Sequence, residues 1–318
     1  MSLESLSLAL APALAHRPFG VARLDHLGVI KITGDDNAKF LQGQLTQDFA
    51  LLGLQEARLA AFCNAKGRMQ ASFIGFKYQS GDHTDIVLVC SKDLIAATMK
   101  RLAMFVMRAK AVLTDASAKF AVYGLLGKQD ATSALTPWSK KEAGSASIVE
   151  LYPAQGLARQ LWVGPATALP PQGEAIDLNT WLLSEVQSGV ATLSTPIFEA
   201  LVPQMLNYES VGGVNFKKGC YPGQEVVARS QFRGTLKRRA YILTCKQSMA
   251  AGALIYSSLD QEQECGLVVQ AATDANGLWW AIASMQVQAA VEGQLTLAAP
   301  AGAALTLHPL PYALLEDI

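Results

Sequence analysis

The sequence has few of the residues that metal sites and disulfide frameworks require. Its 318 residues include four histidines and five cysteines, and no histidine pairs with a cysteine at metal-ligand spacing, so we expect no permanent metal site. An odd number of cysteines without C-x-x-C spacing is typical of reduced thiols in the cytoplasm. The five are Cys63, Cys90, Cys220, Cys245 and Cys265.

Long apolar runs and an excess of charge are also missing. No stretch of about 18 uninterrupted apolar residues occurs, and the first residues carry Glu4 but no lysine or arginine before Arg17. Neither a membrane span nor a signal peptide is therefore predicted. Acidic and basic residues balance at 26 each, which disfavours a strongly basic nucleic-acid binder. We expect a cytoplasmic protein without a membrane partner.

Apolar residues are abundant, at 51% of the chain against 16% charged, which is enough for a sizeable core. Spacings of three and four predict helices after Asp36, whose carboxylate suits a helix cap, from about Asp93, and after Asp177. A further short helix is expected over residues 128–135. Strand-like runs lie at residues 28–32, 73–76, 86–90, 110–113, 120–125 and 157–163.

From about Arg239 the pattern changes to short strands separated by turns, which is typical of a small antiparallel barrel. These strands are predicted at residues 240–245, 266–270, 278–283, 295–298 and 305–307. The order predicts an α+β fold of three domains. They are an N-terminal α+β domain (1–115), a second α+β domain (116–238) and a C-terminal antiparallel β-barrel (239–318).

One segment, residues 215–239, carries most of the recognisable chemistry. Gly219 can adopt backbone conformations closed to other residues and so can present Cys220 in a sharp turn. Pro222 suits the first turn of a helix, which we expect to end before Gly234. A helix N-terminus and nearby cations stabilise a thiolate, so Cys220 is predicted to be a reactive thiol. The alternative is a small buried hydrophobe, which we expect for the other four cysteines.

Within this segment, KKGCYPGQEVVAR resembles the K-G-C-Y-x-G-Q-E signature of the YgfZ family, a long and specific motif. It comprises Lys218, Gly219, Cys220, Tyr221, Gly223, Gln224, Glu225 and Arg229. The likeness covers nearly the whole chain, because ITGDDNAKFLQGQLTQD, CNAKGRMQASF and LHPLPYALLED resemble other family segments. The resemblance implies a three-domain fold around a central hole, like that of T-protein, the aminomethyltransferase of glycine cleavage.

The same resemblance implies a function. The protein would bind tetrahydrofolate, or a formyl or methylene derivative, and support assembly or repair of iron–sulfur enzymes, including those that modify tRNA. Folate and these client enzymes are the implied partners. Trp181 matches a family tryptophan associated with folate binding, and a flat indole suits stacking on a pterin; otherwise it is a core residue of its helix. Leu27 stands where some members have another tryptophan, so we expect a different pocket wall.

Two positions depart from T-protein. T-proteins carry aspartates in the turn aligned with NAKGRMQAS, and aminomethyl transfer needs them. Here Ala71 and Ser72 offer no carboxylate to stabilise a developing cation on the folate nitrogen. The alternative function, a folate-dependent aminomethyltransferase or demethylase, is therefore disfavoured, and the sequence leaves open whether the chain is an enzyme.

The motif segment is also basic, with seven basic residues against one acid, Glu225. Such a strip is typical of an anion site for a folate glutamate tail, a phosphate or RNA, or of a solvated helix face. Direct tRNA binding is the third functional hypothesis, but the strip lacks interleaved aromatics. The basic residues are Lys217, Lys218, Arg229, Arg233, Lys237, Arg238 and Arg239.

Overall fold

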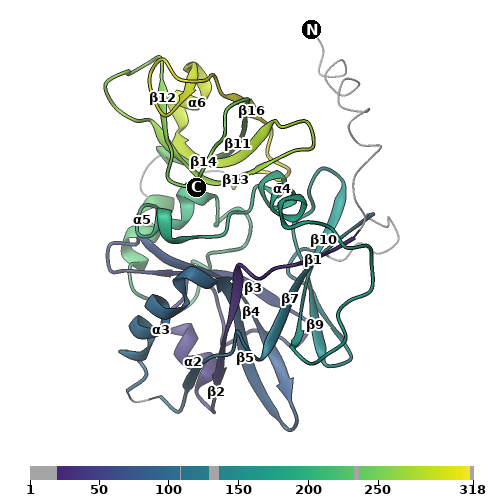
Figure 1. The fold of residues 1–318 in the computed structure, drawn as a ribbon. Coiled ribbons are helices and arrows are strands. Elements are labelled where there is room, and N and C mark those ends of the chain that lie inside the picture. The colour runs from purple at the N-terminus through teal and green to yellow at the C-terminus, as the bar shows by residue number, and fades with distance from the viewer. Residues whose placement is uncertain (1–19, 108, 129–135, 233–235, 316–318) are drawn as a thin grey trace.

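The structure, a computed structural model, describes residues 20–107, 109–128, 136–232 and 236–315 (Figure 1). The described strands form three antiparallel sheets, called here the first, second and third sheet. None of the described helices has the length and hydrophobicity needed to cross a bilayer. The mixed α/β composition agrees with the predicted fold class, whereas the domain boundaries stay a prediction.

The first sheet has the strand order β3-β4-β5-β2-β6. The predictions for β2, β4 and β5 are confirmed, and β6 begins at Val112, two residues after the predicted start. β3 is nearly all buried and lacks the alternation that marks a half-buried strand, so the sequence pattern misses it. The strands are β2 (Leu27–Thr33), β3 (Ala57–Cys63), β4 (Met69–Ser80), β5 (His83–Ser91) and β6 (Val112–Asp115).

Two predicted helices accompany this sheet. They are α2 (Asn37–Gln42) and α3 (Ile95–Ala103), the latter preceded by the 3-10 turn η2 (Lys92–Leu94). Asp36 is the N-cap residue of α2, but its carboxylate accepts a hydrogen bond from the N–H of Lys110 (2.8 Å) and none from the helix. The predicted side-chain cap is therefore wrong, because the carboxylate ties the helix start to the segment before β6.

The second sheet has the order β1-β7-β10-β9-β8. β1 precedes the first sheet in the sequence yet pairs with β7, so the chain crosses between the two sheets. The predicted helix over residues 128–135 lies outside the described residues except for Lys128, which ends β7. The strands are β1 (Gly20–Arg23), β7 (Phe120–Lys128), β8 (Lys140–Ala143), β9 (Ala146–Glu150) and β10 (Leu157–Pro165).

The third sheet is a curled antiparallel sheet in the order β15-β12-β13-β14-β11-β16 (Figure 1). All five predicted C-terminal strands are present, and β12 was not predicted. The elements are β11 (Arg238–Cys245), β12 (Leu254–Ser257), β13 (Gly266–Thr273), β14 (Trp279–Gln286), α6 (Val287–Glu292), β15 (Leu295–Leu297) and β16 (Thr306–His308).

Helix α4 (Leu178–Ser188) lies between the second and third sheets and packs on β13 and β14 (Figure 1). Its start follows the prediction, because the Asp177 carboxylate accepts a hydrogen bond from the N–H of Thr180 (2.7 Å). After α4 the chain makes two 3-10 turns, η3 (Thr195–Ile197) and η4 (Pro203–Leu206), and then reaches α5 (Gln224–Phe232).

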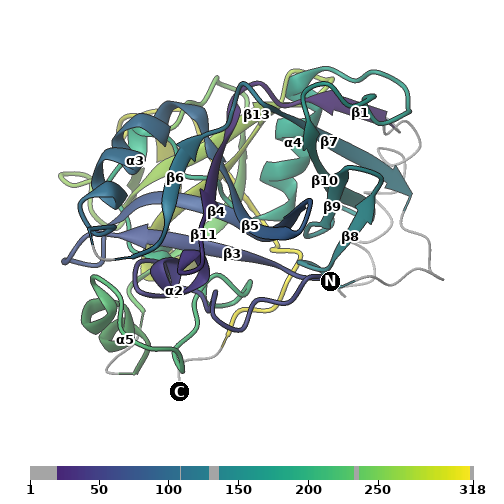
Figure 2. The same ribbon diagram turned by 90° about the horizontal axis from the view of Figure 1, so that it is seen from below.

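One apolar core joins this connecting segment to two sheets. It contains Leu59 of β3, Val186 of α4, Leu206 of η4 and Ile282 of β14, all of them buried. Figure 2 shows β3, β4 and β5 running between α3 on one side and β8 and β9 on the other. The sheets therefore pack around residues 186–214, and this packing positions the candidate site.

Candidate functional site

Cys220 lies in the loop just before α5, and it is the exposed member of the five free cysteines. Burial raises the pKa of the Cys63 and Cys90 thiols to about 12, which makes them poor nucleophiles. The predicted helix is present, but Pro222 lies in the turn ahead of it rather than in its first turn. Exposure thus singles out Cys220 as the accessible thiol.

The conformation of the cysteine loop does not depend on Gly219 in the predicted way. A Cβ added at Gly219 would meet no atom within 4 Å, and its φ is not in the left-handed region. The turn is instead set by Asn215, whose Oδ1 accepts the N–H groups of Lys217 (2.8 Å) and Lys218 (3.1 Å). The motif glycine that the structure requires is Gly223, with φ of +81°.

Gly223 seats the motif against the turn between β3 and β4. A Cβ at this position would lie 2.4 Å from the carbonyl oxygen of Asn64 and 2.7 Å from the Cα of Gly67. Val226, one turn into α5, faces Gly67 in the same contact. Two sequence motifs far apart in the chain, CNAKGRM and KGCYPGQE, therefore pack backbone to backbone.

Lys218 anchors the motif to a third segment. Its Nζ donates to the carbonyl oxygens of Gln42 and Leu45 (2.6 Å to Leu45) and lies 4.6 Å from the centre of the Tyr221 ring. Burial lowers the pKa of Lys218 to about 8. The sequence predicts Lys218 as a cation beside Cys220 in the basic strip; the structure shows a buried ammonium group that donates to backbone carbonyls.

Further hydrogen bonds join the LQGQLTQD segment to the chain before Cys220. Thr46 Oγ1 donates to the carbonyl oxygen of Gly213 (2.6 Å), and the carbonyl oxygen of Thr46 accepts the N–H of Asn215 (2.9 Å). The side chain of Gln47 donates to the carbonyl oxygen of Gly212 (2.6 Å). The cysteine loop is thus held between two segments of the N-terminal third of the chain.

The other motif residues divide between interior and surface. Tyr221 is buried, which raises the pKa of its hydroxyl. Gln224 and Glu225 form the first turn of α5, where a carboxylate interacts favourably with the helix dipole. Glu225 and Arg229 are exposed one helical turn apart and lie on the same face of α5.

The basic strip is not continuous on the surface. Lys218 and Arg239 are buried, and Arg239 pairs with the buried carboxylate of Glu209 (2.7 Å). Arg238 is half-buried and donates to a backbone carbonyl, while Arg233 lies outside the described residues. The prediction of seven surface cations is therefore wrong, because packing uses several of them. The exposed ones that the structure describes are Lys217, Arg229 and Lys237.

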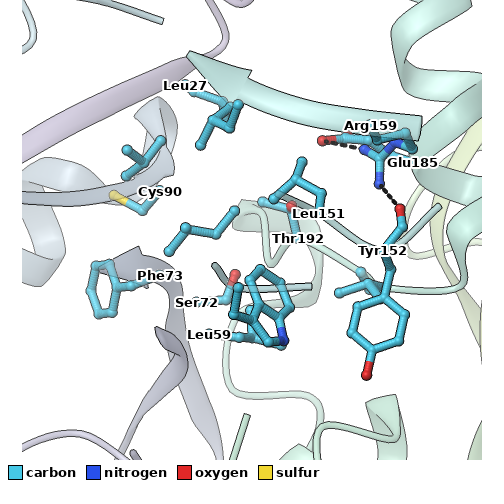
Figure 3. A pocket seen from close by; sticks show the side chains of 16 residues that line it. Leu27, Leu59, Ser72, Phe73, Cys90, Leu151, Tyr152, Arg159, Glu185 and Thr192 are labelled. Carbon is cyan, nitrogen blue, oxygen red and sulfur yellow. Dashed lines mark hydrogen bonds and ion pairs between the residues drawn. The ribbon is translucent and has the colours of Figure 1, made fainter. Parts of the chain in front are cut away.

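A cavity lies between the first sheet, the second sheet and α4 (Figure 3). Its walls come from β2, β3, β4, β5 and β10, from Glu185 of α4 and from residues 190–192, and most are apolar. The free volume is about 40 Å³, enough for a few water molecules, whereas sites for drug-sized ligands span about 300–1,000 Å³. A larger ligand would enter only if a wall moved.

The polar end of this cavity is a buried ion pair. Arg159 and Glu185 lie 3.8 Å apart, and Arg159 also donates to Ser184 Oγ (2.9 Å) and to the carbonyl oxygen of Tyr152 (3.3 Å; Figure 3). Glu185 accepts a further hydrogen bond from Gln270 of the third sheet (2.7 Å). Burial lowers the pKa of Arg159 to about 10, so it is still charged at neutral pH.

Trp181 packs behind this ion pair rather than lining the cavity. It is 0% exposed, the Arg159 guanidinium lies 4.7 Å from its ring centre, and a Cβ on Gly124 would lie 2.3 Å from the ring. Within the described part of the chain its indole N–H has no hydrogen-bond partner. The expected open stacking surface is thus absent in this conformation, and a pterin would reach the ring only if neighbouring side chains moved.

The two positions that align with the T-protein aspartates, Ala71 and Ser72, carry no carboxylate, as the sequence indicates. Ala71 is buried in the core of the first sheet, and Ser72 lines the cavity, where its Oγ accepts the N–H of Leu193 (2.8 Å). Leu27, the position of a second tryptophan in some relatives, also lines the cavity. Sequence reasoning missed Glu185, a carboxylate in the cavity wall, although a serine–glutamate pair inside the apolar run WLLSEV was a usable signal.

Metal binding has no evident site in the ranges that the structure covers. Over those residues, no three histidine, cysteine, aspartate or glutamate side chains gather in a way that would hold an ion.

Comparison with known proteins agrees with this geometry. A solved structure of the glycine cleavage system aminomethyltransferase T from Bartonella henselae has a TM-score of 0.69 and covers 96% of this chain and 89% of its own, at 17% identity. The protein therefore has the T-protein fold. No family model matches the sequence.

Sequence relatives among curated proteins indicate the family as well as the fold. The tRNA-modifying protein YgfZ of Sodalis glossinidius (strain morsitans) is 30% identical over 95% of this chain and 95% of its own length. The protein of the same name from Yersinia enterocolitica is 28% identical over 94% of each chain, and that of Yersinia pestis (strain Pestoides F) 26% over 94% of each. The chain belongs to the YgfZ family.

Proposed function

We propose that this protein binds tetrahydrofolate and supports the assembly or repair of iron–sulfur enzymes in the cytoplasm, including enzymes that modify tRNA. The observation that carries the proposal is the exposed Cys220 on a loop that two distant segments hold in place. Rigid support of one accessible thiol is what a nucleophilic or ligand-transferring cysteine needs. The relatives' name, tRNA-modifying protein, supports the choice of client.

The folate part of the proposal rests on the cavity. A pterin is flat and apolar on its faces and carries N–H donors along one edge, and the cavity offers apolar walls with the Glu185 carboxylate at one end. Tetrahydrofolate, or its formyl or methylene derivative, is the proposed ligand. Trp181 would contribute from behind Arg159 if that side chain moved, since an indole face then becomes available for stacking.

The competing function is a one-carbon enzyme, an aminomethyltransferase or a demethylase. It would need a carboxylate where the folate nitrogen reacts, and Ala71 and Ser72 supply none. Glu185 is a carboxylate in the same cavity, but its oxygens already interact with Arg159 and Gln270. These contacts favour a binding role over catalysis at this end of the cavity.

Direct tRNA contact is a weaker proposal. Three exposed cations, Lys217, Arg229 and Lys237, lie along the motif segment, and phosphate contacts of this kind weaken steeply with salt. Binding of tRNA that falls with rising salt, and that falls further when these cations are replaced by glutamine, would support it.

The decisive experiment has two arms. Titration calorimetry with tetrahydrofolate and 5-formyltetrahydrofolate tests the ligand, and absence of binding for every folate would refute the folate role. In a strain lacking the protein, the wild type should restore thiomethylated tRNA while Cys220→Ser should not, although the variant should fold normally because the site is exposed. Full restoration by Cys220→Ser would refute the role of the thiol.

A further inference from the structure

Trp138 separates two spaces in the molecule. It belongs to the wall of the inner cavity and also to the wall of an outer groove of about 470 Å³, which residues 55–58, 136–139, Gly212 and Asn215 help to line. The inner cavity is small, at about 40 Å³. The two spaces therefore meet at the Trp138 side chain.

The two spaces differ in chemistry. The cavity has apolar walls with an ion pair at one end, whereas the polar lining of the groove includes Gln47, Gln55, Glu56, Arg58 and Asn215. Arg58 pairs with Glu56 at 2.5 Å, and both side chains are partly exposed, so the pair is accessible to a competing carboxylate. A ligand with a flat ring head and an acidic tail matches this division.

The Trp138 side chain is half-buried and packs against two apolar cores, the one around residues 186–214 and the one between the first and second sheets. Its indole N–H donates to the carbonyl oxygen of Val211 (2.8 Å), and its ring centre lies 5.9 Å from that of Tyr152. Its backbone adopts φ of +71°, an unusual conformation for a bulky side chain and one that concentrates at binding sites. Rotation of the indole would break this hydrogen bond and part of its apolar packing, and would join the cavity to the groove.

We propose that Trp138 is the aromatic contact for the folate ring, with the ring head on its cavity side and the glutamate tail in the groove near Arg58. This inference rests on the proposed folate binding and goes beyond it by placing both halves of the ligand. Size supports it, because the head cannot fit a cavity of about 40 Å³ unless a wall moves, and Trp138 is a wall that opens onto a larger space.

The first test compares two tryptophan variants by calorimetry with 5-formyltetrahydrofolate. Trp138→Phe should weaken binding by about tenfold or more, since it removes part of the aromatic surface that the ligand ring would contact. Trp162→Phe is the matched control. It alters a buried tryptophan of β10 that packs on Tyr123 away from the cavity, so affinity should change less than about twofold.

The second test concerns the tail and does not depend on Trp138. Arg58→Gln should weaken binding of tetrahydrofolate and of its polyglutamate form but leave a tail-less tetrahydropterin unaffected. Glu56→Gln removes the ion pair with Arg58 and should therefore strengthen binding of the ligands that carry a glutamate tail.

The outcomes of these tests distinguish failure of the ligand placement from failure of the proposed folate binding. If the wild type binds none of these probes, the proposed folate function fails and the inference with it. If the wild type binds but Trp138→Phe binds equally well, the ring contact is refuted. If Arg58→Gln leaves tailed ligands unaffected, or weakens tailed and tail-less ligands alike, the placement of the tail is refuted while the folate function stands.

Discussion

Replacing Gly223 by alanine should detach the cysteine motif from the rest of the protein. The added Cβ would lie 2.4 Å from the Asn64 carbonyl oxygen and 2.7 Å from the Gly67 Cα, and both contacts are with backbone atoms that cannot rotate away. Gly223 also has φ of +81°, which alanine tolerates poorly. Either the turn at residues 64–67 or the start of α5 must move.

The expected cost has two parts. The left-handed conformation costs alanine about 1–2 kcal/mol. The clash adds the loss of packing between the two turns, and together we expect roughly 2–4 kcal/mol, in the upper range for a single substitution. Because the Gly223 carbonyl accepts the first hydrogen bonds of α5, from the N–H groups of Val226 and Val227, the helix start should also loosen.

The assay compares Gly223→Ala with Gly219→Ala, a glycine in the same motif. A Cβ at Gly219 meets nothing within 4 Å, so that variant should be neutral or slightly more stable. Guanidinium unfolding followed by tryptophan fluorescence gives the stability of each, and iodoacetamide labelling gives the accessibility of Cys220. Equal stability of the two variants would show that the contact between the motif and the 64–67 turn is not formed.

Two further predictions concern the motif chemistry. In the native protein, alkylation followed by peptide mapping should label Cys220 first. Cys63 and Cys90 should be labelled only after unfolding, because their thiols are buried and have raised pKa values. Equal labelling rates for the three thiols would contradict this prediction. The pKa of Lys218 is lowered to about 8, so between pH 8 and about 10.5 the unfolded chain holds a proton that the native state has lost. From pH 7 to 9 the unfolding free energy of the wild type should therefore rise relative to that of Lys218→Met. A difference that does not change with pH would show that Lys218 titrates normally.

Local signals in the sequence predicted local structure well. The Asp177 cap, the helix α5 after the motif and most strands were identified because periodicity and capping depend on neighbouring residues. The family signature likewise indicated Cys220, and the structure shows it exposed. The structural role given to Gly219 belongs to Gly223, because φ and close approach at these two residues depend on what packs against them.

Long-range contacts explain what could not be predicted. Lys218 looks like a surface cation in a basic run, and only the approach of residues 42–45 shows that it is buried against backbone carbonyls. Trp181 looks like an open aromatic face until Arg159, 22 positions earlier, is seen beside its ring. Pairing of β1 with β7 likewise joins residues about a hundred positions apart, which no periodicity reveals.

The cysteine loop and the groove are parts of one connected structure. Asn215 lines the groove and, through its side-chain oxygen, also fixes the turn that leads to Cys220. The β3–β4 turn beneath Gly223 continues into β4, whose residues 72–74 form a wall of the inner cavity. Hydrogen bonds from the Thr46 hydroxyl and from the buried Lys218 ammonium group tie residues 42–46 to residues 213–218, so the loop that carries Cys220 is anchored next to the groove. The single exposed thiol is thus supported by two distant segments of the chain, residues 42–47 and 64–67.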